Sequence, residues 1–296
     1  MKINKEIQEQ LVNFIDNSTL SQSAIAKKMA VSPTTISLYL QSKYNGDNSV
    51  LEKKIKEFLE REAQRQKAKK FSFVQTIASK KIMNGCQLAF DTQDIVLIVG
   101  NAGLGKTISL KNYASNTEAT TYIECDLTHT PKSILQEIAE QKKLVLEKKD
   151  FHSVNKAVVK ALSSSDELII FDEAELLSYK SLEVIRRLHD KTEAAIVLAG
   201  LPSLKNNLRG KKGENKQLFS RIGLVVDIGN ELSKEDLTKI INSQEDLKPF
   251  VEDLIALSKG NPRRLNKIVK GAFRLLNKGE VLTKASFQNY SSLLLG

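Results

Sequence analysis

A glycine-rich segment directly after a short apolar run constrains this chain more than any other feature. The apolar run spans Ile95 to Val99, and the eight residues that follow it are Gly100, Asn101, Ala102, Gly103, Leu104, Gly105, Lys106 and Thr107. Glycines at this spacing let backbone N–H groups curl around phosphate oxygens, while the lysine reaches the terminal phosphates and the hydroxyl residue holds Mg²⁺. The segment predicts a nucleotide site between a strand and a helix; a chance glycine-rich turn is the alternative.

A second apolar run ends in two acids. Residues 168–171 are followed by Asp172 and Glu173. A buried strand that ends in this way delivers both carboxylates to the edge of the sheet where α/β folds bind their ligands. We predict that Asp172 holds Mg²⁺ together with Thr107, and that Glu173 is the general base that orients the attacking water. Two acids after a strand are also common turn residues, but the glycine-rich segment upstream favours the catalytic interpretation.

The middle of the chain alternates short apolar runs with helical stretches. The strands are expected at 95–99, 121–125, 168–171, 195–199 and 224–228. Short β-branched strands separated by helices indicate a parallel sheet covered by helices on both faces. After residue 233 the pattern is helical again. The predicted fold class is α/β: a five-stranded parallel sheet flanked by helices, followed by a C-terminal helical lid.

The N-terminal part is predicted to be all-α. Ser32 and Pro33 are expected to cap and open a helix that follows another helix ending near residue 30, which predicts a helix-turn-helix unit. Ile36 and Leu40 would then pack inward. The outward hydroxyl residues predicted to contact DNA are Thr34, Thr35 and Ser37. A small helical module that binds protein is the alternative.

Charge supports a polyanionic partner. The chain has a net charge of +10, and residues 1–70 contain 13 Lys and Arg against 8 Asp and Glu. This excess suits double-stranded DNA bound mainly without sequence specificity, although a basic, highly soluble surface would look the same. The longest apolar runs are too short to cross a bilayer, so we expect a cytoplasmic protein with no membrane partner. The domain boundaries predicted from these shifts are 1–65, 66–232 and 233–296.

Two arginine-containing segments complete the pattern. Leu218 to Ile222 includes Arg221 just before the fifth expected strand, and Gly260 to Arg264 opens a helix of the C-terminal lid. Together with the glycine-rich loop, the two acids and the helical lid, these segments resemble the AAA+ ATPases. The order of a repressor-like helix-turn-helix unit and then these motifs is similar to the transposition helper ATPases, the target-DNA activators of transposing phages. The similarity covers nearly the whole chain.

The resemblance implies roles for the arginines. Arg221 lies where the family has an arginine finger, which acts on the γ-phosphate held by a neighbouring subunit; a surface salt bridge is the alternative. Arg263 would reach the γ-phosphate within its own subunit, with Arg264 as the adjacent alternative. A polar residue usually ends the fourth strand in this family. Here the strand runs out through Ala199, Gly200, Leu201 and Pro202. Ser203 is the first side chain able to hydrogen-bond, so this role stays unassigned.

Further DNA contacts are expected in two loops. The segment 205–216 is basic and contains two glycines, which suits phosphate contacts, although a solvated loop fits equally well. By analogy with relatives that encircle DNA, the loop after the second strand also lines the DNA path. The loop residues predicted to bind DNA are Lys132, Arg209, Lys211 and Lys212.

Several functions are compatible with these motifs. The first hypothesis is an ATPase that uses ATP and Mg²⁺ to form a filament or ring on target DNA, delivers that DNA to a transposase and stimulates it. The chain lacks the Asn-Lys-x-Asp pattern of guanine-selective proteins, so ATP is favoured. The alternative is a helix-turn-helix transcription regulator switched by nucleotide. A replication-type loader or a secretion ATPase with the same core is a third possibility.

Overall fold

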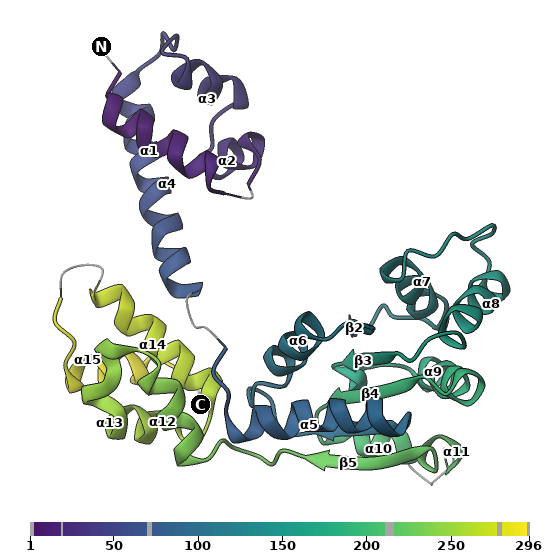
Figure 1. The fold of residues 1–296 in the computed structure, drawn as a ribbon. Coiled ribbons are helices and arrows are strands. Elements are labelled where there is room, and N and C mark those ends of the chain that lie inside the picture. Colours follow the sequence, from purple (N-terminus) through teal and green to yellow (C-terminus); the bar gives the residue numbers. More distant parts are fainter. Residues whose placement is uncertain (1–2, 19, 70–72, 211–215, 277–279, 295–296) are drawn as a thin grey trace. The chain divides into compact units, whose positions relative to one another are not determined.

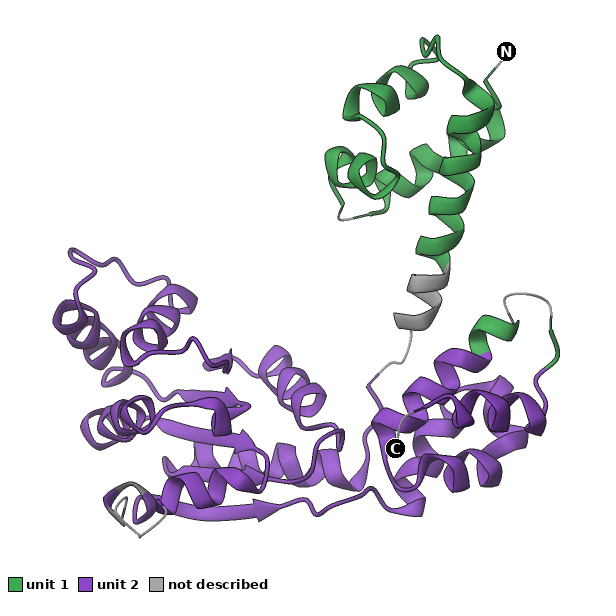
Figure 2. Cartoon of the chain, turned by 180° about the vertical axis from the view of Figure 1, so that it is seen from behind, with its two compact units in different colours: residues 1–72, 273–281 green, residues 73–272, 282–296 purple. Residues whose placement is uncertain are grey.

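The protein was analysed as a computed structural model that describes residues 3–18, 20–69, 73–210, 216–276 and 280–294. The chain divides into two compact units, coloured in Figure 2. The smaller unit contains residues 1–72 and 273–281, and the larger unit contains residues 73–272 and 282–296. No helix among the described residues is long and apolar enough to span a membrane.

The N-terminal part of the smaller unit is built from four helices. They are α1 (Lys5–Asp16), α2 (Gln22–Lys28), α3 (Pro33–Leu40) and α4 (Asn48–Lys69), which runs past residue 65. The Ser32 side chain accepts a hydrogen bond from the Thr35 backbone N–H, so α3 begins as the sequence predicts. Ile36 is buried as expected, but Tyr39 is the second fully buried residue of α3, whereas Leu40 only packs against this core.

A five-stranded parallel sheet organises the larger unit (Figure 1). Its strands are β1 (Ile95–Val99), β2 (Thr120–Glu124), β3 (Leu168–Asp172), β4 (Ala195–Gly200) and β5 (Ile222–Asp227). The strand order is β2-β3-β4-β1-β5. All five predicted strands are therefore present, with β2 beginning one residue and β5 two residues earlier than expected. Because β1 is paired on both sides, its carboxyl end opens between the ends of β4 and β5.

Helices cover both faces of this sheet. The helices of the sheet region are α5 (Ile77–Thr92), α6 (Lys106–Asn116), α7 (Pro131–Gln141), α8 (Phe151–Leu162), the 3-10 turn η1 (Ala174–Leu176), α9 (Tyr179–Thr192), α10 (Ser203–Arg209) and α11 (Lys216–Phe219). Alternate residues of the strands point to opposite faces. Ile95, Leu97 and Val99 join the core formed with α7, α8 and α9. On the opposite face, α5 approaches so closely that a Cβ on Gly85 would lie 3.3 Å from Ile98.

The helical lid follows β5 and belongs to the larger unit except for residues 273–281. It contains α12 (Lys234–Asn242), the 3-10 segment η2 (Glu245–Phe250), α13 (Val251–Ser258), α14 (Pro262–Leu276) and α15 (Lys284–Ser292). Asp236 of α12 is buried and accepts hydrogen bonds from the backbone N–H groups of Ile77 and Ala78. Ile77 and Ala78 are the first two residues of α5, so their N–H groups have no partner within that helix and are satisfied by this carboxylate. This contact ties α12 of the lid to α5 beneath the sheet.

Candidate functional site

The glycine-rich loop follows β1, and its first two residues hydrogen-bond to the ends of the neighbouring β4 and β5 segments. The Gly100 N–H donates to the Gly200 carbonyl oxygen at 3.3 Å, and the Asn101 N–H donates to the Gly229 carbonyl oxygen at 3.2 Å. A Cβ on Gly100 would lie 2.2 Å from a side-chain carbon of Ile228, so a larger residue would not fit there. Gly103 and Gly105 have φ of +89° and +86°, in the left-handed region that glycine adopts without strain. The loop therefore has the tight backbone curl that a phosphate cradle requires.

Lys106 lies at the bottom of this loop, in the first turn of α6. Its side chain is 6% exposed, and its ammonium donates to the Gly100 and Asn101 carbonyl oxygens at 2.7 and 3.0 Å. Burial lowers the pKa of Lys106, and the nearby carboxylates of Glu173, Glu175 and Asp172 act in the opposite direction. The lysine and the three acids therefore share one electrostatic environment at the carboxyl edge of the sheet.

Asp172, the last residue of β3, is fully buried. One of its carboxylate oxygens accepts a hydrogen bond from the Tyr122 hydroxyl at 2.8 Å, and the other accepts from the Glu173 backbone N–H at 3.0 Å. These bonds fix the carboxylate orientation. Tyr122 comes from the middle of β2, and the sequence reasoning missed it because only the pairing of β2 with β3 brings it to Asp172.

Glu173 has an unusual backbone conformation for a non-glycine residue, with φ +55° and ψ +36°. Such conformations cost about 1–3 kcal/mol and concentrate at functional sites. Burial, followed by contact with the Glu175 carboxyl group and the charge of Asp172, raises the pKa of Glu173 above its usual range. A raised pKa favours proton uptake by a carboxylate, which suits a general base. Glu175 is a second residue of the site that the sequence reasoning did not single out.

The structure places Arg263 and Arg264 in different surroundings. Arg263 is exposed at the start of α14, and its Cβ lies 3.1 Å from the position a Cβ on Gly103 would occupy, so it borders the glycine-rich loop. Arg264 turns away into the lid, where it donates to the Leu257 carbonyl oxygen at 2.8 Å and to the Ser291 hydroxyl at 2.9 Å. Arg263 is therefore the arginine available to a nucleotide, and Arg264 holds the lid together.

Arg221 lies at the opposite edge of the sheet. It directly precedes β5, and because all strands are parallel, the start of β5 is the edge away from the glycine-rich loop. Its side chain is 53% exposed and its Nε donates to Asp190 Oδ1 at 2.9 Å; Asp190 also contacts Arg186. A five-residue strand is about 17 Å long. Arg221 therefore lies far from the nucleotide site of its own chain and is available at the surface.

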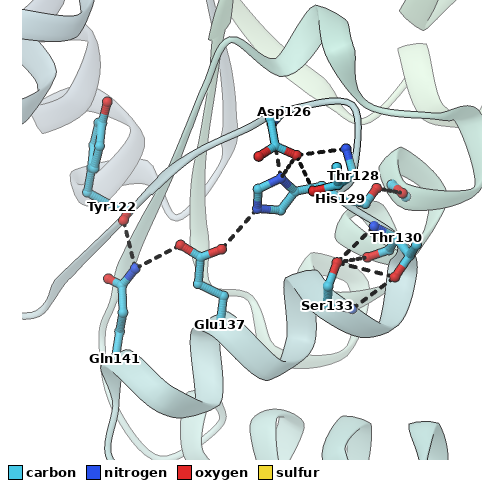
Figure 3. Close-up of polar contacts among 9 residues, drawn as sticks. Tyr122, Asp126, Thr128, His129, Thr130, Ser133, Glu137 and Gln141 are labelled. Atoms are coloured by element: carbon cyan, nitrogen blue, oxygen red, sulfur yellow. Dashed lines mark hydrogen bonds and ion pairs between the residues drawn. The ribbon is translucent and has the colours of Figure 1, made fainter.

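The loop after β2 is held by a connected set of polar side chains (Figure 3). His129 lies between two carboxylates, with Asp126 Oδ1 at 3.0 Å and Glu137 Oε2 at 2.9 Å from its ring nitrogens. Thr128 also donates to Asp126. Lys132 is exposed in the first turn of α7, directly after this loop. The described residues contain no cluster of acidic, His and Cys side chains that could hold a metal ion by itself.

The remaining predicted DNA contacts lie in both units. In α3, Thr34 is exposed, whereas Thr35 and Ser37 are partly buried; the Thr35 hydroxyl contacts Ser32, and the Ser37 hydroxyl accepts from Gln41. In the larger unit the Arg209 guanidinium stacks on the Phe219 ring at 4.7 Å from its centroid. Lys211 and Lys212 lie outside the described residues.

The geometry fits a nucleotide with Mg²⁺. The curled loop offers backbone N–H groups to phosphates at the N-terminus of α6. Thr107 in the first turn of α6 and Asp172 at the end of β3 supply a hydroxyl and a carboxylate, the hard oxygen ligands that Mg²⁺ prefers. The end of β4 is Gly200 and has no side chain, and Ser203 is exposed in α10. The polar group that the resemblance places at the end of β4 therefore does not come from that strand.

Comparison with known proteins agrees with this geometry. A family described as an AAA domain matches residues 89–208. The chain is 28% identical over 287 residues to the ATP-dependent target DNA activator B of Escherichia phage Mu, covering 93% of this chain and 90% of the relative. It is 24% identical over 220 residues to the Mu-like prophage FluMu DNA transposition protein B of Haemophilus influenzae, covering 72% of this chain and 76% of the relative.

Among solved structures, the Aeropyrum pernix ORC2 protein, determined as ADPNP–ADP complexes, has a TM-score of 0.57 at 16% identity. The match covers 76% of this chain and 70% of that protein. At this identity the similarity concerns the fold. The five-stranded sheet with its flanking helices and lid is therefore an arrangement that other nucleotide-binding proteins share.

Proposed function

We propose that this AAA-domain ATPase binds double-stranded DNA when it holds ATP, oligomerises on that DNA as a filament or ring, and delivers it to a transposase, which it stimulates. The relatives named as a target DNA activator and as a DNA transposition protein support the role in transposition. The observation that supports assembly is the position of Arg221. It is exposed at the sheet edge opposite its own nucleotide site, from which it would reach the site of another subunit rather than its own.

The residues of one chain would act as follows. Lys106 neutralises phosphate charge, and the loop N–H groups hold the phosphate oxygens. Thr107 and Asp172 would hold Mg²⁺, which when bound would offset the negative charge of the phosphates. Glu173 accepts the proton of the attacking water. Arg263, at the start of a lid helix and beside the loop, would couple the nucleotide state to the position of the lid.

Arg221 of a neighbouring subunit would complete this site. An arginine supplied in trans stabilises transition-state charge and is worth about 10³–10⁵ in rate in known phosphoryl-transfer enzymes. The ion pair with Asp190 is exposed, and such pairs contribute only about 0–1 kcal/mol, so Arg221 can leave it at little cost. Assembly would therefore be needed for efficient hydrolysis, and hydrolysis would dismantle the assembly.

DNA contact would use basic surfaces on several elements. Arg263, Lys267 and Lys270 are exposed on α14, one helical face that starts at the nucleotide site. Lys132 and Arg209 add exposed charge in the larger unit, and Thr34, Thr35 and Ser37 of α3 supply hydroxyl groups in the smaller one. Contacts of this kind bind phosphates irrespective of sequence and weaken with salt.

The test is a DNA-binding experiment on unrelated duplexes of equal length, with ATP, with ADP and without nucleotide. We expect ATP-dependent binding that is uniform across sequences, falls as salt rises and grows cooperatively with duplex length. One tight site without polymerisation would support a nucleotide-switched transcription regulator instead. For the later step, strand transfer by a candidate transposase is measured with and without this protein. Unchanged strand transfer would contradict the delivery role.

A further inference from the structure

Glu175, in the 3-10 turn η1 after β3, carries an unusual carboxylate. Both of its carboxylate oxygens are buried, and neither receives a hydrogen bond from an N–H or O–H group among the described residues. A buried carboxylate without a donor is costly, and such groups in a folded protein call for an explanation. When Glu173 is ionised, as a general base must be, no described residue donates to either oxygen of Glu175, and a water molecule is the remaining donor.

The surroundings of Glu175 place that carboxylate in the nucleotide site. Its charge acts on the Lys106 ammonium, and its carboxyl group contacts that of Glu173. A Cβ on Gly200 would lie 2.1 Å from Glu175 Oε2 and 3.1 Å from its Cδ. The carboxylate therefore lies directly against the end of β4 and takes the space that a side chain at position 200 would fill.

We propose that Glu175 is a further catalytic residue, which accepts one hydrogen bond from the attacking water while Glu173 accepts the other. The buried acceptors of Glu175 would then be satisfied by that water. As the water oxygen bonds to the γ-phosphorus, the bond from phosphorus to the bridging oxygen breaks, that oxygen takes the electron pair, and the proton passes to Glu173. Glu175 gains no proton and fixes the direction of attack.

This inference rests on the proposed role of Glu173 as the base, and it gives a physical reason for Gly200. With glycine at the end of β4, the carboxylate from η1 has room to reach the site. The Glu175 carboxylate from η1 would thus occupy the position where the AAA+ resemblance places a polar side chain at the end of the fourth strand. We therefore expect substitutions at positions 175 and 200 to have coupled effects on ATP hydrolysis.

The test begins with Glu175→Gln, which keeps the shape of the side chain. We expect kcat for ATP hydrolysis to fall by about 10- to 100-fold, up to the lower limit of what general acid–base catalysis contributes, because Glu175 orients the water but takes no proton. The Kd of a fluorescent ATP analogue should stay unchanged, and the melting temperature should stay equal or rise, because an unpaired buried acid has been removed. Unchanged kcat would overturn the proposal.

A double-mutant cycle with Gly200→Ala provides the matched control. Its Cβ would displace the Glu175 carboxylate, so kcat should fall when Glu175 is present and should not fall further in the Glu175→Ala background. Equal losses in both backgrounds would show that Gly200 acts without Glu175 and would contradict the inference. If Glu175→Ala does not fold, Glu175→Ser replaces it in the cycle.

Glu173→Gln is measured beside these variants. Loss of hydrolysis in Glu173→Gln together with wild-type kcat in Glu175→Gln would sink this inference alone. Wild-type kcat in Glu173→Gln would instead contradict the proposed base. Because the ATP analogue is bound in every case, these outcomes are separate from any effect on nucleotide affinity.

Discussion

Charged side chains are buried at the carboxyl edge of the central sheet and exposed at the amino edge. At the carboxyl edge, Lys106 and Asp172 are buried, and Glu173 shares a partly desolvated site with another acid. At the amino edge, Arg221 is 53% exposed and Asp190 pairs it at the surface. Desolvated charges interact strongly and are suited to chemistry, whereas exposed pairs exchange partners easily. This difference fits the proposal that the carboxyl edge carries most of a nucleotide site and that Arg221, at the amino edge, would complete the site of a neighbouring subunit.

The largest effect is expected from the buried lysine. Lys106→Ala should lower kcat/KM for ATP by about 10³-fold or more, because a desolvated cation beside the phosphates is lost. Lys111→Ala is the matched control: it removes an exposed lysine from the same helix, where Lys111 pairs with Glu124 at 2.6 Å. Nucleotide affinity and steady-state hydrolysis check both variants. Equal losses in the two would show that the buried position of Lys106 has no special role.

At the amino edge, loss of Arg221 should lower the rate of hydrolysis without lowering ATP affinity. Arg221→Ala is expected to lower kcat by about 10³-fold while ATP affinity and melting temperature stay unchanged, because the residue acts only on a neighbour's nucleotide. The control Arg187→Ala removes an arginine with 68% exposure that pairs with Glu183 on α9. Hydrolysis is measured across protein concentrations. A first-order dependence with no loss in Arg221→Ala would place the whole site within one chain.

The two neighbouring arginines of α14 sharpen the contrast between function and stability. Arg263→Ala should lower kcat by about 10-fold or more with little change in stability. Arg264→Ala should instead cost about 2–3 kcal/mol of unfolding free energy, because its bonds to Leu257 and Ser291 are partly buried. Chemical denaturation and ATPase assays of both variants check this division. The opposite result would assign the nucleotide contact to Arg264.

The smallest effect on activity is expected at Glu183 of α9, which contributes to acid stability rather than to the nucleotide site. Hydrogen bonds from Arg186, and then from Arg187, hold the pKa of Glu183 at about 2, against 4.5 ordinarily. A pKa lowered by folding stabilises the native state above pH 4.5, and that contribution is lost as the pH falls toward 2, by up to about 3 kcal/mol. Glu183→Gln should therefore destabilise the protein at pH 7, with the difference vanishing near pH 2. An exposed control, Glu118→Gln, should show no such trend.

Features that depend on contacts between neighbouring residues in the chain could be predicted from the sequence. The loop from Gly100 to Thr107 and the acids after β3 follow directly from short patterns, because strand, turn and helix signals lie side by side in the chain. Leu40 packs against the core as predicted, but the sequence reasoning missed Tyr39, which is fully buried and whose hydroxyl donates to Glu52 of α4 at 3.2 Å. The signals in α3 therefore predicted where the helix starts and that Ile36 and Leu40 pack inward, but not the contact between Tyr39 and a separate helix.

Other features depend on contacts between segments far apart in the chain. Tyr122 reaches Asp172 only through the pairing of β2 with β3, and Glu175 reaches Gly200 only because η1 packs on β4. No spacing rule in the sequence encodes such juxtapositions. The roles of Arg263 and Arg264 could likewise be separated only once the lid was placed against the glycine-rich loop.

Mixing two inactive variants tests the shared site most directly. Glu173→Gln lacks the proposed base but keeps Arg221, and Arg221→Ala keeps the base. If the site is completed by a neighbour, a one-to-one mixture should regain hydrolysis at about a quarter of the interfaces, those that pair an intact base with an intact arginine. Each variant alone should be nearly inactive. A mixture as inactive as its components would contradict completion of the site in trans.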